Sequence, residues 1–177
     1  EEQKQEFLPK LARGEMFLCY GLSEPNVGGD LASVETRSAM EGDEIVINGA
    51  KRWCTGADWS DYIYCLTRSG PPEERYKNLT FLLIPTNAPG VSMQAIEHSN
   101  LRYTKSMDVY FDNVRLPKSA IVGGEQNWNQ GWKLLAGRAL DVEKIEITAV
   151  AYGIARAAVE EAWQYAQERE QFGKPIS

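Results

Sequence analysis

The feature that most constrains the fold is a change in the spacing of apolar residues near residue 127. Before it, short apolar or alternating runs are separated by Gly, Pro, Asn and Asp, a pattern typical of β-strands joined by turns. After it, apolar residues recur at helical spacing as far as Ala166. This order of patterns predicts an α+β fold: a mainly antiparallel β-barrel or sandwich, followed by one long α-helix of a helical domain.

The β part is expected to consist of short strands with regular turn signals, which favours a barrel or a sandwich. The dipeptide Asn48-Gly49 lies between alternating segments, and Asn-Gly is the strongest short-range signal of a hairpin turn. We therefore expect a hairpin within residues 44–55. The other strands are expected at 16–19, 34–39, 62–67, 79–84, 91–96 and 107–111.

The helical part is predicted as one helix of about forty residues, at a rise of about 1.5 Å per residue, with Gly137 and Gly153 inside it. Its apolar side chains have few partners within this sequence. We therefore expect a substantial exposed apolar stripe, which would promote self-association.

Composition excludes several classes of protein. A formal net charge of −6 argues against non-specific nucleic-acid binding. No apolar run is long enough to span a membrane. The three cysteines, Cys19, Cys54 and Cys65, form no C-x-x-C pair and lie in apolar contexts. They are interpreted as buried thiols in a reducing compartment, so we expect no metal site and a cytoplasmic location, or the mitochondrial matrix if the source is eukaryotic.

Residues 20–30 form a glycine-containing segment that is the first of four motifs in this sequence. Their sequence is Tyr-Gly-Leu-Ser-Glu-Pro-Asn-Val-Gly-Gly-Asp, and it follows a short apolar run. Glycine has no Cβ, so such a loop lets a ligand approach backbone N–H groups closely. Taken alone, the segment is better interpreted as a tight surface turn, because it contains no Lys or Arg.

Three further segments change that interpretation. They are Ile-Val-Ile-Asn-Gly-Ala-Lys-Arg-Trp-Cys-Thr at 45–55, Phe-Asp-Asn-Val-Arg-Leu-Pro at 111–117 and Arg-Glu-Gln-Phe-Gly-Lys-Pro at 169–175. In order and spacing, the four segments resemble the flavin-dependent acyl-CoA dehydrogenase family. Its corresponding patterns are roughly Y-x-x-T/S-E-P-x-x-G-S-D, N-G-x-K-x-W-I-T, F-D/E-x-V-x-V/L-P and R-x-x-F-G-x-P/L-I.

The resemblance implies a domain organisation and an activity. Residues 1–13 would end a helical N-terminal domain, 14–122 would form the middle β domain, and 123–177 would begin a helical C-terminal domain, so we expect a fragment of a longer protein. The implied cofactor is FAD and the implied substrate an acyl-CoA. An electron-transfer flavoprotein and further copies of the chain are the implied partners. An acyl-CoA oxidase, or a catalytically silent β module, is the alternative.

The resemblance also implies residues that bind the flavin. Trp53 would lie by the flavin ring and the Thr55 hydroxyl would hydrogen-bond its N5 atom, with Cys54 between them in place of the usual Ile. Arg169 would reach the FAD pyrophosphate of a neighbouring subunit. The alternatives are a core strand residue for Trp53, a strand end for Thr55 and a solvated helix end for Arg169. The other residues implied to line the flavin are Tyr20, Leu22, Ser23, Gly28 and Gly29.

The catalytic base and the CoA contacts are implied less directly. In this family a Glu removes the α-proton of the acyl group while hydride leaves the β-carbon. Residues 140–144, Leu-Asp-Val-Glu-Lys, are similar to the L-D-L-E-R pattern of the isovaleryl and long-chain types, which makes Glu143 the candidate base. The alternative is that Glu143 is an ordinary helix charge making an i,i+4 contact, with the base a Glu in a later part of the C-terminal domain. Asp141 and Lys144 match positions that contact CoA, and Gly29 replaces a Ser that helps to hold it.

Overall fold

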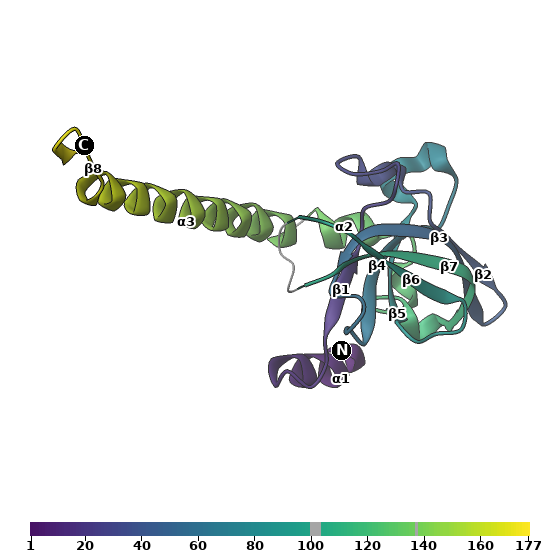
Figure 1. The fold of residues 1–177 in the computed structure, drawn as a ribbon. Helices are drawn as coiled ribbons and strands as arrows, with labels where there is room; N and C mark the ends of the chain where they lie inside the picture. Colours follow the sequence, from purple (N-terminus) through teal and green to yellow (C-terminus); the bar gives the residue numbers. More distant parts are fainter. Residues whose placement is uncertain (100–103, 137) are drawn as a thin grey trace. The chain divides into compact units, whose positions relative to one another are not determined.

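The computed structural model describes residues 1–99, 104–136 and 138–177. It divides into two compact units, Glu1–Leu134 and Leu135–Ser177, and each is described by itself. Figure 1 labels their α-helices and most of their strands.

The first unit is built on one curled, mixed sheet of seven strands, which confirms the predicted α+β class (Figure 1). Four of its pairings, β2–β3, β3–β7, β4–β5 and β6–β7, are antiparallel, whereas β1 and β2 run parallel to β4. The order is β1-β4-β2-β3-β7-β6, with β5 also paired to β4. The strands are β1 Leu18–Gly21, β2 Arg37–Glu41, β3 Glu44–Thr55, β4 Tyr62–Arg68, β5 Leu79–Pro85, β6 Val91–Ile96 and β7 Ser106–Pro117.

Helices of the first unit are short. Helix α1 spans Glu2–Ala12 and is tied to the end of the sheet, because the Gln3 side chain donates to the carbonyl oxygens of Ser119 and Ile121. The other helical segments are 3₁₀ turns η1 Leu31–Ser33, η2 Pro72–Lys77, η3 Lys118–Ala120 and η4 Glu125–Asn127, followed by helix α2, Gly131–Leu135, whose last residue belongs to the second unit.

The core lies on the inner face of the curled sheet. Alternate residues of β3 and β4, such as Ile45, Ile47 and Ile63, are fully buried there together with Val109 of β7. Burying an aliphatic side chain of this size contributes about 1.5–3 kcal/mol, so the alternation that predicted the strands also holds the sheet in its curl.

The predicted hairpin at Asn48-Gly49 is wrong. Strand β3 runs through both residues, and the hairpin turn lies instead between Glu41 and Glu44, which pair across β2 and β3. Gly49 has a φ of +146°, and a Cβ there would lie 2.6 Å from the Cα of Thr36. The glycine is therefore required by a close approach of two backbones, and the β3–β7 register shifts at the same point.

The second unit contains helix α3, Arg138–Glu168, and a small hairpin of β8, Glu170–Gln171, and β9, Lys174–Pro175. The prediction of one helix of about forty residues is wrong, because α2 ends at Leu135 and α3 spans 31 residues. Gly153 lies within α3, whereas Gly137 lies outside the described residues.

Helix α3 carries many exposed apolar side chains, which confirms the predicted apolar surface. Ile145 is 71% exposed and Trp163 is 69% exposed. The others are Val142, Ile147, Val150, Tyr152, Ile154, Val159 and Tyr165. Across residues 1–99, 104–136 and 138–177, no helix combines the length and the apolar character needed to cross a membrane.

Candidate functional site

The loop that follows β1 is joined to β3 by a backbone hydrogen bond. The amide of Arg52 donates to the carbonyl oxygen of Ser23 at 2.8 Å. Ser23 and Leu22 are half-buried beside the strand, and the next residue of β3 after Arg52 is Trp53. The structure therefore brings together two segments that the sequence analysis treated as separate motifs.

Trp53 lies in a bulge, where the pairing of β3 with β7 shifts between Lys51 and Cys54. Its φ of +62° is left-handed, and its indole is 54% exposed, with the Arg52 guanidinium 5.2 Å from the ring centroid. The alternative of a core residue is therefore wrong for Trp53. Cys54 is fully buried, so the structure leaves no part of it accessible to a ligand.

Thr55 ends β3 with an exposed side chain. Its hydroxyl shares a hydrogen bond with the Ser106 hydroxyl at 2.8 Å. Two hydroxyl groups carry two protons, and their mutual bond uses one. The pair therefore keeps one proton with which to donate to a ligand.

Tyr20 supplies a second exposed ring, and 61% of it is accessible. It packs edge-on against Tyr64 at 5.7 Å, and Tyr64 stacks on Phe81 at 4.3 Å. Burial, and then the nearby Tyr20, raise the pKa of Tyr64 to about 12, so that hydroxyl stays neutral. Gly28 and Gly29 are exposed, and a Cβ at either would meet no atom within 4 Å.

Beneath these residues lies an ion pair that the sequence analysis missed. The Lys51 ammonium lies 2.8 Å from the Glu24 carboxylate, and their side chains are only 0% and 2% exposed. Burial raises the pKa of Glu24, but the charge of Lys51 and hydrogen bonds from Lys51, Glu35 and Thr36 outweigh it and leave the pKa lowered. The sequence did contain a signal for this pair. Lys51 lies an even number of residues after Ile45 and Ile47, so its side chain is on the buried face of β3.

The remaining candidates lie in the second unit. Asp141, Glu143 and Lys144 are exposed on α3, and the Lys144 ammonium lies 3.6 Å from the Asp141 carboxylate. Such a solvated pair contributes little to stability. Arg169 follows α3 with its side chain exposed, and its backbone bonds to Tyr165 and Ile176.

Comparison with known proteins decides which family these residues belong to. Residues 19–114 match the family described as "Acyl-CoA dehydrogenase, middle domain", and residues 129–177 match "Acyl-CoA dehydrogenase, C-terminal domain". The chain belongs to the acyl-CoA dehydrogenase family. The resemblance on which the sequence analysis relied is thereby confirmed.

Individual members of the family give the extent of the match. Acyl-CoA dehydrogenase AFT10-1 of Alternaria alternata is 36% identical over 99% of this chain and 39% of its own length. A crystal structure of a "probable acyl CoA dehydrogenase" of Mycobacterium abscessus matches with a TM-score of 0.89, at 29% identity, over 99% of this chain and 46% of that one. A glutaryl-CoA dehydrogenase of Mycobacterium smegmatis, in complex with FADH2, matches with a TM-score of 0.83, at 32% identity, over 100% and 43%. This chain thus spans less than half the length of each.

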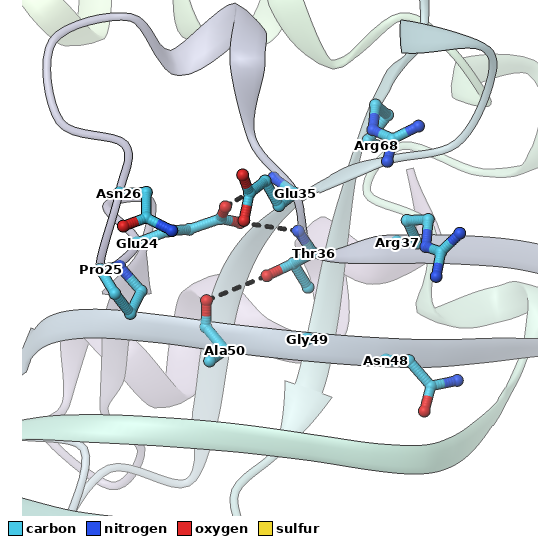
Figure 2. Close-up of a pocket in the computed structure, with 10 residues that line it drawn as sticks. All are labelled: Glu24, Pro25, Asn26, Glu35, Thr36, Arg37, Asn48, Gly49, Ala50 and Arg68. Carbon is cyan, nitrogen blue, oxygen red and sulfur yellow. Dashed lines mark hydrogen bonds between the residues drawn. The ribbon is translucent and has the colours of Figure 1, made fainter.

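A pocket of this chain lies behind the loop, away from the residues that the resemblance implies for the flavin. Its volume is about 540 Å³. Figure 2 shows lining residues from the loop, from β2 and from β3 around it. Its lining residues are Glu24, Pro25, Asn26, Glu35, Thr36, Arg37, Asn48, Gly49, Ala50 and Arg68. The lining includes Glu24 but none of the residues implied to bind FAD. The pocket is therefore not the site that the resemblance implies for the flavin.

The three thiols of the family member are buried and free, as the sequence analysis predicted. Burial raises the pKa of Cys19 to about 11 and that of Cys65 to about 12, and it also raises the pKa of Cys54. Within the described ranges, no group of three or more His, Cys, Asp or Glu side chains is placed to hold a metal ion.

Proposed function

We propose that this chain is a segment of an FAD-dependent acyl-CoA dehydrogenase that desaturates the Cα–Cβ bond of an acyl-CoA thioester. Family membership supports the reaction class, and the chain spans less than half of its relatives. The structural observation that carries the proposal is the bond from the Arg52 amide to Ser23, which joins the loop to the strand of Trp53 and Thr55.

The exposed groups of the first unit fit a flavin. Two aromatic rings, Tyr20 and Trp53, offer apolar faces, and the open backbone at Gly28 and Gly29 leaves room for a flat ligand. The Thr55–Ser106 pair keeps a proton for an acceptor such as flavin N5. When bound, FAD supplies the acceptor for the substrate hydride. Ser23 and Leu22 would hold the same ligand from the loop.

The second unit carries the groups that we assign to the substrate and to the cofactor's charge. Glu143 would accept the α-proton of the acyl group, the alternative being a Glu later in the complete protein. Asp141 and Lys144 would contact CoA together with Gly29. Arg169 would pair its fork of donors with the FAD pyrophosphate of a neighbouring subunit.

The partners and the domain limits belong to the same proposal. We assign residues 1–13, 14–122 and 123–177 to the N-terminal, middle and C-terminal domains. The exposed apolar side chains of α3 support a homo-oligomer or further helices that cover them. The electron acceptor is proposed to be an electron-transfer flavoprotein, and the location the cytoplasm or, in a eukaryote, the mitochondrial matrix.

The test begins with the visible absorption spectrum of the purified chain, with and without added FAD, after desalting. A retained flavin spectrum supports a cofactor site formed by this segment, whereas an empty one indicates that the isolated segment is a silent module. In the complete enzyme, anaerobic addition of acyl-CoA should bleach the flavin. Full bleaching by a Glu143→Gln variant would contradict the assigned base, and oxygen consumption on acyl-CoA would indicate an oxidase.

A further inference from the structure

The buried ion pair of Glu24 and Lys51 lies at the base of both segments that we assign to the flavin. Besides its bond to Glu24, the Lys51 ammonium donates to the carbonyl oxygen of Leu22 at 3.1 Å. Its side chain passes beneath Gly21, where a Cβ would lie 3.5 Å from the Lys51 Cγ. Lys51 therefore holds the first residues of the loop against β3.

The carboxylate of Glu24 closes the loop on itself. One oxygen accepts both from Lys51 and from the amide of Thr36, at 2.8 and 2.9 Å, and the other accepts from the amide of Glu35. Figure 2 shows this carboxylate directed at residues 35 and 36, which are the far end of the loop. The segment between them contains Gly28 and Gly29, so a single side chain fixes both ends of the loop that carries these glycines.

Two further hydrogen bonds fix the loop relative to strand β3. The Thr36 hydroxyl donates to the Ala50 carbonyl oxygen at 3.1 Å, and the Arg52 amide donates to Ser23 at 2.8 Å. Lys51 lies between Ala50 and Arg52, two residues before Trp53. The ion pair is thus surrounded by the contacts that set the loop and Trp53 relative to each other.

A stabilising role alone does not account for such a pair. Removing two charges from water is costly, and well-packed apolar residues in place of a buried ion pair are often as stable or more so. A carboxylate that accepts three hydrogen bonds from fixed directions, by contrast, imposes one geometry on the groups that donate them. The distinctive contribution of Glu24 and Lys51 is therefore geometric.

We propose that Glu24 and Lys51 are a positioning pair, which sets the affinity for FAD and the flavin's spectroscopic environment by fixing the Ser23–Gly29 loop relative to Trp53. This inference rests on the proposed function. Neither residue touches the ligand in this assignment, because both side chains are buried beneath the loop.

The test compares variants of the complete enzyme. Glu24→Gln turns an NH₂ group toward backbone amides that donate, and it leaves the Lys51 ammonium with no negative charge beside it. The double variant Glu24→Gln/Lys51→Met removes that charge and should recover thermal stability. Arg115→Gln is the matched control, because its ion pairs with Glu41 and Glu44 are on the surface of the same sheet.

The measurements are the Kd for FAD, the visible spectrum and reduction potential of bound flavin, and the melting temperature of the apoprotein. We expect at least a tenfold rise in Kd and a shifted flavin spectrum in Glu24→Gln. The double variant should regain stability while both changes persist, and Arg115→Gln should match the wild type. If the double variant regains wild-type Kd and spectrum along with its stability, the pair is merely structural and the inference is overturned.

The same experiment separates the inference from the proposed function. A wild-type enzyme that binds no FAD overturns the proposed function, and the positioning role with it. A wild-type enzyme that binds FAD, together with a folded Glu24→Gln variant of equal Kd and spectrum, overturns the positioning role alone.

Discussion

Removing the Lys51 charge should strongly destabilise the first unit. The variant Lys51→Met keeps an unbranched side chain of similar width but leaves the Glu24 carboxylate buried with no ammonium group beside it. Glu24 lines the pocket behind the loop but is only 5% exposed, so water is a poor substitute for the lost ammonium group. Breaking a buried ion pair in this way typically costs about 3–5 kcal/mol.

The loss of unfolding free energy has an upper limit, because the Glu24 carboxylate can become neutral by taking up a proton. A free Glu has a pKa of about 4.3, so holding it protonated at pH 7 costs about 3.7 kcal/mol, at 1.36 kcal/mol per pH unit. We therefore expect Lys51→Met to lower the free energy of unfolding by about 3–4 kcal/mol at pH 7.

The pH dependence of that loss gives the sharper test. In the wild type the pKa of Glu24 is lowered, so its stabilising contribution is present above the unfolded-state pKa and is lost as the pH falls through the folded-state pKa. In Lys51→Met we expect the buried carboxyl, which has lost the neighbouring ammonium charge, to take up a proton in the folded state, so the free-energy penalty of burying it shrinks on acidification. The difference in the free energy of unfolding between the wild type and Lys51→Met should fall by about 2.7 kcal/mol between pH 7 and pH 5.

Urea unfolding of the purified chain, followed by tryptophan fluorescence at pH 7 and pH 5, measures both quantities. Arg115→Gln is the control, and it should cost no more than about 1 kcal/mol because its ion pairs are exposed. A loss below about 1 kcal/mol for Lys51→Met at pH 7, or a loss that stays constant with pH, would refute the reasoning.

Three other outcomes follow from the structure. Gly49→Ala should lower the free energy of unfolding by about 1–3 kcal/mol, because its φ of +146° and the approach to Thr36 both exclude a Cβ; an unchanged urea midpoint would count against this. The thiols should resist a disulfide reagent at pH 8 in the native chain and react after unfolding, since burial raises the pKa of Cys19 to about 11 and of Cys65 to about 12; rapid native labelling would contradict their burial. Ile145→Glu on α3 should reduce dye binding and self-association in sedimentation experiments without moving the unfolding midpoint of the sheet, and equal self-association would rule out this face.

The strands were predictable because their pattern is local. Ile63 and Cys65 alternate with the half-buried Tyr62 and Tyr64, and such an alternation is enough to choose the inner face of the sheet. The family motifs likewise gave the domain types, since each motif can be recognised from a few neighbouring residues. Local patterns therefore account for the predicted fold class.

The Asn48-Gly49 prediction failed for a reason that no local pattern contains. The dipeptide suits a turn equally well, but β3 continues through it because the partner that requires a glycine, Thr36, approaches from another part of the chain. Trp53 illustrates the same limit, since its exposed indole depends on a bulge against β7. A bulge is a property of two paired strands, so one strand's sequence does not specify it.

The ion pair was missed because a lysine and a glutamate are each expected at the surface when considered singly. Glu24 lies in the first of the four motifs and Lys51 in the second, so each motif holds one half of a buried pair together with residues that face outward, such as Trp53. The two motifs are thus complementary in charge as well as adjacent in space. It follows that a change at either position alone should be far more damaging than a matched change at both, which is the relation that the variants of Glu24 and Lys51 measure.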